Sequence, residues 1–493
     1  KRITETRLAV EQLRDDNRLD MSDPEVSKLL MSTLTVHQAV CFYLYYSERL
    51  SIRDVGKLLQ VDHSTILRTI QRAVARIRDA LGGQMHGSVV LDGDGKSVRP
   101  CILWNDGRSH EETKYLNETV GEEALVRMTG NIAFAGFTAP KLMWIKRNEP
   151  ENFARIRKIM LPKDYVVYRL TGSFTTDMSD ASGTLLYDVG RGEWSEEMCR
   201  ICSVGRDMLP EVLRSYEIAG RLNEEGAELL GLEAGIPVMA GAADNAAAAT
   251  GTGAIGAGGC NISLGTSGTV FVCTDDYKRG GGEMHSFRHA DGGYHLMGCM
   301  LSAAECNRWW TELVCRSDYS AEQADVPAPG SAGVLFLPYM MGERSPHNDT
   351  DARSVFVGMR PSTTRAEMGL AVMEGVSFGL RDILDRAGVR VDRARICGGG
   401  ARSALWRRIT ASALGVTLET VATEKGPAYG AALLAMTGCG EYNSLKEACD
   451  ACVRVTDEIL PDGELKARYD ELYKVYAGLY PALRQTFRNM RGI

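Results

Sequence analysis

Glycine is distributed along this chain in a way that excludes one continuous architecture. Of the 52 glycines in 493 residues, only Gly56 lies within residues 1–81, and the other 51 follow from Gly82 onward. Glycine marks the tight turns of α/β folds, whereas its near absence over a long segment is typical of continuous helices. The net charge changes sign at the same place, from +2 over residues 1–81 to −9 over the remainder. The pattern predicts a boundary at Gly82-Gly83.

The segment before this boundary reads as helices. Residues 34–46 are apolar and aromatic, and after a turn at 61–63 a further helix is predicted over 65–81. Between Arg49 and Arg78 there are seven basic and two acidic residues. These features favour a helix-turn-helix that contacts DNA through residues 49–78, although a helical bundle with a solvated arginine face explains them too. The candidate DNA contacts are Ser64, Thr65, Arg68 and Arg72.

The composition of the whole chain is that of an ordinary globular protein. Apolar residues make up 44% and charged residues 25% of the chain. The formal charge of −7 argues against electrostatic binding of nucleic acid or an anionic membrane by the chain as a whole. No stretch approaches the roughly 18 apolar residues that a membrane span needs, and the first residues lack the apolar core of a signal peptide. Together with 13 scattered cysteines, these features predict a cytoplasmic protein with reduced thiols and no membrane contact.

After Gly83 the sequence has the pattern of alternating strands and helices that is typical of an α/β fold. Short runs of Val, Ile and Leu, such as 236–240 and 394–397, end in glycine-rich turns and are followed by helical stretches. A second boundary is expected within the small residues of 235–258. The expected parts are therefore residues 1–82, 83–245 and 246–493.

A glycine-rich turn follows one of the predicted strands. Residues 263–270 read as a strand, a tight turn at Gly265, Thr266 and Ser267, and a returning strand. Backbone N–H groups and hydroxyls in such a turn can converge on a phosphate. Many hairpins carry the same residues without binding anything, so the turn alone does not decide between the two interpretations.

A second glycine-rich turn lies between a predicted strand and a helix. Residues 396–403 contain Gly399 and Gly400 and end at Ser403. Glycines at this junction permit a flat or anionic ligand to approach the backbone near a helix N-terminus. An ordinary strand-to-helix turn is the alternative. Neither a P-loop nor a dinucleotide-binding fingerprint is present.

Residues 241–246 contain the candidate for acid–base chemistry. Asp244 and Asn245 follow a probable strand and precede a run of small residues. A carboxylate there could take a proton from a hydroxyl nucleophile, and the neighbouring amide could hold a polar substrate. Asp244 could equally cap a helix.

Two further groups of residues offer ligands. Residues 83–87 and 102–108 combine His86 with Trp104 and several polar side chains, as sugar sites commonly need, although a solitary histidine or tryptophan is more often structural. The two Cys-x-x-Cys pairs, at 199–202 and 449–452, lie in helical patterns far apart in the sequence. Structural zinc usually uses closer, loop-borne pairs, so no metal site is predicted.

Taken together, these stretches resemble the FGGY carbohydrate kinases, and most closely the xylulose kinase subgroup. The resemblance runs from Gly83 to about Arg488. Gln84-Met85-His86-Gly87 followed by residues 102–108 is similar to the subgroup's sugar-binding motif. Further matching stretches at 176–184, 342–346 and 426–432 fall in the family's order.

The resemblance implies an α/β protein with the two-lobed, ribonuclease H-like fold of the actin-like ATPases. It implies that the chain uses ATP and Mg²⁺ to phosphorylate a ketose, D-xylulose to D-xylulose 5-phosphate, with Asp244 as general base. It also implies that Met85, His86, Asp244 and Asn245 line the sugar site, that Gly265, Thr266 and Ser267 hold phosphate, and that Gly399, Gly400 and Ser403 border the adenosine.

One feature of the family is missing from residues 1–82. Family members open with an Asp-x-Gly-Thr/Ser phosphate hairpin and further strands, and neither Gly56 nor Gly82 lies in such a motif. We therefore expect a truncated first lobe after a small all-α helix-turn-helix unit, reduced turnover, and an unpaired sheet edge that favours a homodimer. An alternative function is a sugar-responsive DNA-binding regulator with an impaired kinase-like domain.

Overall fold

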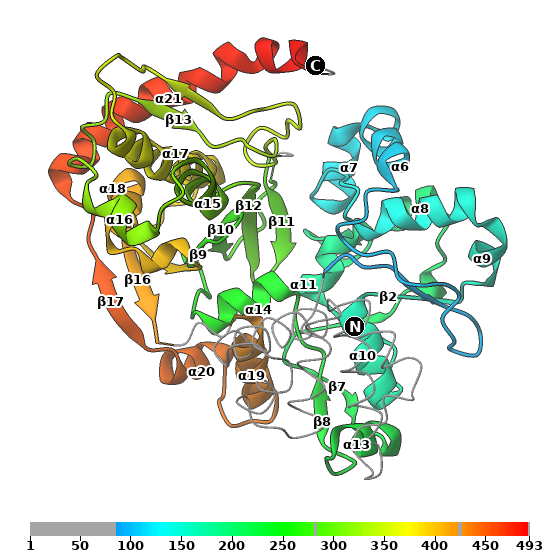
Figure 1. Cartoon of the computed structure of the whole chain (residues 1–493). Coiled ribbons are helices and arrows are strands. Elements are labelled where there is room, and N and C mark those ends of the chain that lie inside the picture. Colours follow the sequence, from blue (N-terminus) through cyan, green and yellow to red (C-terminus); the bar gives the residue numbers. More distant parts are fainter. Residues whose placement is uncertain (1–84, 281–282, 423–425, 492–493) are drawn as a thin grey trace, which may run out of the picture. The chain divides into compact units, whose positions relative to one another are not determined.

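In the computed structural model, the described residues are 85–280, 283–422 and 426–491, which belong to one unit, Met85–Ile493 (Figure 1). The predicted helix-turn-helix, with the candidate DNA contacts Ser64, Thr65, Arg68 and Arg72, lies outside these residues. The regulator alternative depends on that segment. It stays a prediction, as do the truncated first lobe, the unpaired edge and the homodimer.

The apolar runs that glycine turns interrupt form a seven-stranded sheet. β9, β15 and β16 are parallel neighbours, whereas β10, β12 and β11 continue from β9 as an antiparallel meander, and β17 closes the other edge antiparallel to β16. The sheet and its connecting helices confirm the predicted α/β class. In spatial order the strands are β11 (His285–Arg288), β12 (Tyr294–Met300), β10 (Gly268–Thr274), β9 (Cys260–Leu264), β15 (Arg393–Cys397), β16 (Thr417–Val421) and β17 (Val455–Ile459).

Both faces of this sheet are covered, which explains why β10 carries the continuous apolar run 270–273. Successive side chains of a strand point to opposite faces. Val270 and Val272 belong to one hydrophobic core, whereas Phe271 and Cys273 belong to a second one. A strand buried on both faces reads as a continuous apolar run rather than an alternating one.

Three long helices cover the first face. α17 (Arg365–Ala387) packs on β10 and β12 and also contacts α18 (Ala404–Leu414) and α21 (Gly463–Asn489) (Figure 1). Phe378 and Trp406 are buried among them. Glycine in the left-handed conformation ends α17 and α18, and a capping box at Thr364 starts α17.

On the second face, α14 (Asp244–Gly251) packs against α19 (Pro427–Gly438) (Figure 1). Their backbones approach closely: a Cβ added to Gly430 would lie 1.8 Å from the carbonyl oxygen of Ala247. The buried alanines of α14 join the second core, which collects side chains both from residues 85–254 and from the large sheet. The boundary expected between 245 and 246 would fall inside α14.

The first part of the unit builds on two-stranded sheets rather than one large sheet. β1 pairs antiparallel with β2, and β3 pairs in parallel with β6. The strands of this part are β1 (Val89–Leu91), β2 (Lys158–Met160), β3 (Thr175–Asp177), β4 (Tyr187–Asp188), β5 (Glu193–Trp194), β6 (Glu211–Leu213), β7 (Ile218–Arg221) and β8 (Pro237–Met239). Its helices are α6 (His110–Tyr115), η1 (Leu116–Gly121), α7 (Glu122–Thr129), α8 (Thr138–Asn148), α9 (Pro150–Arg155), α10 (Pro162–Thr171), α11 (Met178–Ala181), η2 (Ser182–Thr184), α12 (Glu196–Cys202), η3 (Arg206–Met208) and α13 (Glu224–Leu230).

The remaining elements are short and flank the large sheet. They are α15 (Ala304–Arg308), η4 (Trp309–Val314), α16 (Tyr319–Ala324), β13 (Leu335–Leu337), β14 (Val355–Val357), η5 (Gly400–Arg402) and α20 (Leu445–Cys452). Across the described part of the chain, no helix combines the length and the apolar character needed to cross a bilayer.

Candidate active site

His86 is held in an unusual backbone conformation at the entry to β1. Its φ of 69° lies in the left-handed region, which costs energy for a residue with a side chain. Its carbonyl oxygen accepts hydrogen bonds from Lys141 Nζ at 2.8 Å and Thr138 Oγ1 at 3.2 Å, both on α8. A Cβ at Gly183 would lie 2.6 Å from the His86 ring and 2.8 Å from Met85 Cε. The glycine therefore allows both side chains to lie against η2.

The imidazole of His86 is neutral at physiological pH. Its Nδ1 lies 2.8 Å from the carbonyl oxygen of Gly183, and because a carbonyl only accepts, Nδ1 carries the proton. Its pKa is lowered to about 3, mainly by burial; the hydrogen bond to Gly183 opposes this shift, and the positive charges of Lys141 and Arg344 add to it. Nε2 is then an acceptor, able to receive a hydrogen bond from a sugar hydroxyl.

An aromatic cluster surrounds His86. The ring of His86 lies 4.7 Å from that of Phe137, and Phe134 lies 4.8 Å from His285, which comes from β11 of the large sheet. The guanidinium of Arg344 lies 5.9 Å from the Phe134 ring centroid. Sequence reasoning missed Phe134, His285 and Arg344 as neighbours of this site. The sequence of residues 342–346 predicts no role for Arg344, and only the fold brings Arg344 close to Phe134.

Asp244 and Asn245 occupy the start of α14. Ala243 is the N-cap residue and Asp244 the first helical residue, so the alternative in which Asp244 caps the helix is wrong. Its Oδ1 accepts a hydrogen bond from the backbone N–H of Asn245 at 2.8 Å. The partial positive charge of a helix N-terminus favours the ionised form of a carboxylate.

The start of α14 lies against the Met85–His86 segment. Asn245 Nδ2 is 3.7 Å from Met85 Sδ, although the two residues are 160 positions apart. Met85 is buried, whereas His86, Asp244 and Asn245 are half-buried. The fold thus brings the predicted sugar-site residues to one place.

A buried charged group lies beneath this place. Lys163 Nζ is 2.7 Å from Asp164 Oδ1, 3.2 Å from Asp177 Oδ1 and 3.9 Å from Asp180 Oδ2. Burial lowers the pKa of Lys163, but the three carboxylates outweigh it, so the pKa lies above its ordinary value. Burial raises the pKa of Asp180 well above its usual range, and the charge of Asp244 adds to this while Lys163 opposes it. Sequence reasoning included Asp177 and Asp180 in a matching stretch but gave them no role.

The two glycine-rich turns lie side by side. β9 and β15 are parallel, with Cys397 opposite Ser263, so the turns that follow them leave the same edge of the sheet. A Cβ on Gly398 would lie 2.7 Å from the backbone of Leu264 and 2.9 Å from the nitrogen of Gly265. This close contact, together with the hairpin between β9 and β10, confirms the predicted strand–turn elements.

The individual residues of these two turns differ in their exposure and packing, and therefore in whether they are open to a ligand. Thr266, Ser267 and Gly399 are exposed, and a Cβ on Gly399 would meet no atom within 4 Å. Gly400 is buried, and a Cβ there would lie 2.7 Å from the Leu264 side chain, so packing requires this glycine. Ser403 caps α18 by accepting from Trp406 N at 3.1 Å, and its hydroxyl donates to Gln323 Oε1 at 2.7 Å.

The other sequence candidates lie elsewhere. Trp104 is 49% exposed, and the two Cys-x-x-Cys pairs lie on α12 and α20, as their helical patterns predict. Among the residues that the structure describes, no three His, Cys, Asp or Glu side chains gather as a metal site.

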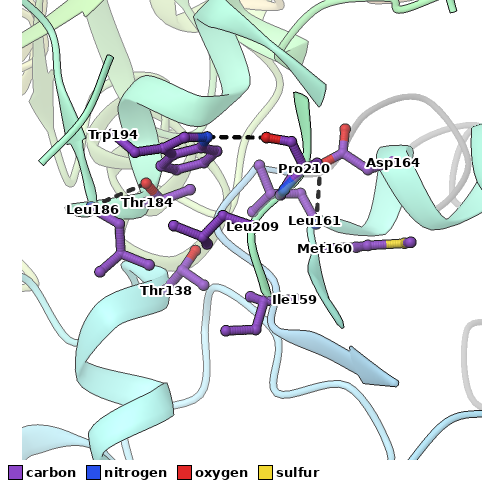
Figure 2. A pocket seen from close by; sticks show the side chains of 10 residues that line it. All are labelled: Thr138, Ile159, Met160, Leu161, Asp164, Thr184, Leu186, Trp194, Leu209 and Pro210. Atoms are coloured by element: carbon purple, nitrogen blue, oxygen red, sulfur yellow. Dashed lines mark hydrogen bonds between the residues drawn. The ribbon is translucent and has the colours of Figure 1, made fainter. Parts of the chain in front are cut away.

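Figure 2 shows a largely apolar cavity around Trp194, whose Nε1 donates to Pro210 O at 3.0 Å. The side chains that line it are those of Thr138, Ile159, Met160, Leu161, Asp164, Thr184, Leu186, Trp194, Leu209 and Pro210.

Comparison with known proteins places these features in one family. Residues 33–251 match the FGGY family of carbohydrate kinases, N-terminal domain, and residues 260–439 match the C-terminal domain of the same family. The first match begins at residue 33 and so includes the segment for which a helix-turn-helix was predicted. Together the two matches cover most of the chain.

Similar proteins include named enzymes and solved structures. The chain is 40% identical over 414 residues to the xylulose kinase of Escherichia coli K12, and the aligned region covers 82% of this chain and 84% of that protein. It is 35% identical over 413 residues to the xylulose kinase of Staphylococcus xylosus, with 81% and 85% covered. The crystal structure of a xyloylose kinase from Brucella ovis matches with a TM-score of 0.76 and 37% sequence identity, and the match covers 86% of this chain and 90% of that one. These likenesses confirm the expected actin-like fold class.

Proposed function

The chain belongs to the FGGY family of carbohydrate kinases, and we propose that it transfers the terminal phosphoryl group of ATP to D-xylulose, giving D-xylulose 5-phosphate and ADP. The observation that carries the proposal is the contact between Asn245 and Met85. It joins the Met85–His86 segment to the start of α14, whose first residue is Asp244, and we expect a bound sugar to present a hydroxyl there. The relatives named xylulose kinase support the choice of sugar.

In the proposed reaction, Asp244 is the general base. Its carboxylate takes the proton of the attacking sugar hydroxyl while the hydroxyl oxygen bonds to the γ-phosphorus and the bond to the β,γ-bridging oxygen breaks. The partial positive charge at the N-terminus of α14 favours a negatively charged side chain at this position. Asn245 and the Nε2 atom of His86 orient the sugar through its other hydroxyls.

The nucleotide is proposed to lie on the two neighbouring turns. Gly265, Thr266 and Ser267 offer backbone N–H groups and hydroxyls to the phosphates, and the open space at Gly399 suits the flat adenosine. Gly400 and Ser403 act through packing and the start of α18.

Mg²⁺ would accompany the nucleotide and neutralise phosphate charge when bound. Phosphate oxygens and water usually supply most of its ligands, with one or two carboxylates.

Turnover is proposed to be low. The chain carries no Asp-x-Gly-Thr/Ser hairpin in residues 1–82, and this hairpin would supply phosphate-binding groups from the first lobe. Loss of a single preorganised donor costs about 2.7–4 kcal/mol of transition-state stabilisation, or about 10²–10³ in kcat. A kcat equal to that of relatives that contain the hairpin would contradict this expectation.

The test is a coupled assay of ADP release with D-xylulose. Asp244→Asn should lower kcat by about 10²–10⁴ because it removes the base, with little change in KM for either substrate. Asp450→Asn is the control, because Asp450 is an exposed carboxylate on α20 whose ion pair with Lys446 is worth little. Absence of xylulose-dependent ADP release in the wild type, or full activity in Asp244→Asn, would refute the proposal.

A further inference from the structure

The loop that precedes Asp244, residues 240–243, is held by hydrogen bonds at both of its ends. Lys163 Nζ donates to the carbonyl oxygen of Ala240 at 3.0 Å. The backbone N–H of Ala243 donates to Ser179 Oγ at 3.0 Å. Between them, Gly241 N donates to the carbonyl oxygen of Ser215 at 3.0 Å. The backbone just before the base is therefore held by residues of three other elements or loops.

Asp177 joins these three attachments. Its Oδ2 accepts from Ser179 Oγ at 2.5 Å, from Ser179 N at 2.9 Å and from Ser215 Oγ at 2.8 Å. Its Oδ1 lies 3.2 Å from Lys163 Nζ. Asp177, Ser179 and Ser215 each have no exposed surface. A fully buried carboxylate is tolerated because it has this many donors.

The sequence explains why this network forms. Asp177 is the last residue of β3 and also the N-cap of α11, so its side chain turns back to the first N–H groups of that helix. Ser179 then lies in the first turn of α11, where its hydroxyl can donate to Asp177 and still accept a hydrogen bond from elsewhere. Ala243 supplies that second bond.

We propose that Asp177 and Ser179 are positioning residues for the phosphoryl transfer: they fix the loop of residues 240–243 and thereby the place of Asp244. The inference rests on the proposed role of Asp244 as base. Neither residue has exposed surface through which it could contact a substrate. Their contribution is geometric, since a misplacement of about 1 Å in a catalytic group can cost about 10² in rate.

Ser182 provides a matched control for Ser179 within the same short stretch. It is also buried, and its hydroxyl likewise makes one donated bond, to Met178 O at 2.7 Å, and one accepted bond, from Arg288 N at 3.0 Å. Neither of these two bonds involves residues 240–243. Replacement of either serine by alanine therefore removes the same number of hydrogen bonds, but only Ser179→Ala releases the loop before the base.

The experiment compares Ser179→Ala, Ser182→Ala and the wild type in the full 493-residue chain, with two readouts. Hydrogen exchange of the peptide covering residues 240–247 should become at least tenfold faster in Ser179→Ala and remain unchanged in Ser182→Ala. In the ADP-release assay, kcat of Ser179→Ala should fall about 10- to 100-fold while KM for ATP stays constant, and Ser182→Ala should keep its kcat.

The two readouts separate this inference from the proposed function. An unchanged exchange rate in Ser179→Ala, a kcat within twofold of the wild type, or equal effects of both serine substitutions would overturn the inference. If the wild type does not phosphorylate D-xylulose, the proposed function fails, and the exchange rates alone still decide whether Ser179 holds the loop.

Discussion

The positions of several residues at the candidate site are determined by contacts that form only in the folded chain. Met85, His86 and Asn245 were predictable as candidates from short motifs, because the motifs themselves carry the polar groups of His86 and Asn245 beside Met85; their role in binding a sugar stays a prediction. Ser179 and His285 were not, because their importance comes from partners far away in the sequence: Ser179 contacts Ala243, 64 positions away, and His285 comes from the large sheet. Ser179 lies in the matching stretch 176–184, but neither that stretch nor the sequence around His285 indicates these distant partners.

The substitution Gly399→Ala, which adds one methyl group, tests whether the adenosine of ATP lies at this residue. Its φ of −60° and ψ of −41° suit alanine, and a Cβ there meets no protein atom within 4 Å. If adenosine lies at this position, Gly399→Ala should raise KM for ATP about tenfold, equivalent to about 1.4 kcal/mol, without lowering stability. Steady-state kinetics with varied ATP measures this.

Gly463→Ala is the control for that substitution. Gly463 starts α21, and a Cβ there also meets no atom within 4 Å. Its KM for ATP should equal that of the wild type. An unchanged KM in Gly399→Ala would remove this residue from the nucleotide site.

At the scale of elements, the turns and strands were predictable and the packing between helices was not. The hairpin between β9 and β10 and the turn after β15 follow from apolar runs that end in glycine. The pairing of α14 with α19 depends on the facing glycines Gly251 and Gly430 and on the alanines around them. The stretch 426–432 was noted in the sequence as a family match, and the structure gives it a role in supporting the helix that begins with Asp244.

Gly430→Ala tests this helix pairing. The new Cβ would lie 1.8 Å from the carbonyl oxygen of Ala247, so α14 and α19 must separate. We expect a loss of about 3 kcal/mol in the free energy of unfolding, and a lower kcat because α14 moves. Urea unfolding and the ADP-release assay measure the two effects.

The matched substitution is Gly478→Ala in α21, another helical glycine. A Cβ at Gly478 meets no atom within 4 Å, so alanine should stabilise the helix by about 0.5–1 kcal/mol. Equal stability of the two variants would mean that α14 and α19 do not approach as closely as described.

At the scale of the whole molecule, buried titratable groups set the pH range of stability. Burial lowers the pKa of His86 to about 3 and that of His347 to about 4. The unfolded chain therefore binds protons below about pH 6.5 that the folded chain does not, and stability falls as the pH falls. Burial raises the pKa of Glu343 to about 8 and that of Glu374 to about 7, so stability falls as the pH rises from about 4.5 towards 8.

These opposite effects predict a stability maximum on the acidic side of neutrality. Between about pH 4.5 and 6.5 the histidine and carboxyl contributions oppose each other, whereas outside this window one of them acts alone. The urea midpoint, followed by tryptophan fluorescence, should be highest within this window and fall on both sides. A midpoint that increases steadily from pH 6 to pH 8 would be inconsistent with the burial of Glu343 and Glu374.

The central claim is that Asp244 faces the hydroxyl that receives the phosphoryl group. A crystal structure of the chain with D-xylulose and a non-hydrolysable ATP analogue measures this directly. We expect one carboxylate oxygen of Asp244 about 2.6–3.2 Å from the terminal sugar hydroxyl, with the analogue's phosphates on the Thr266 turn. A sugar bound with that hydroxyl turned away from Asp244, or at a site without Met85 and His86, would contradict the account.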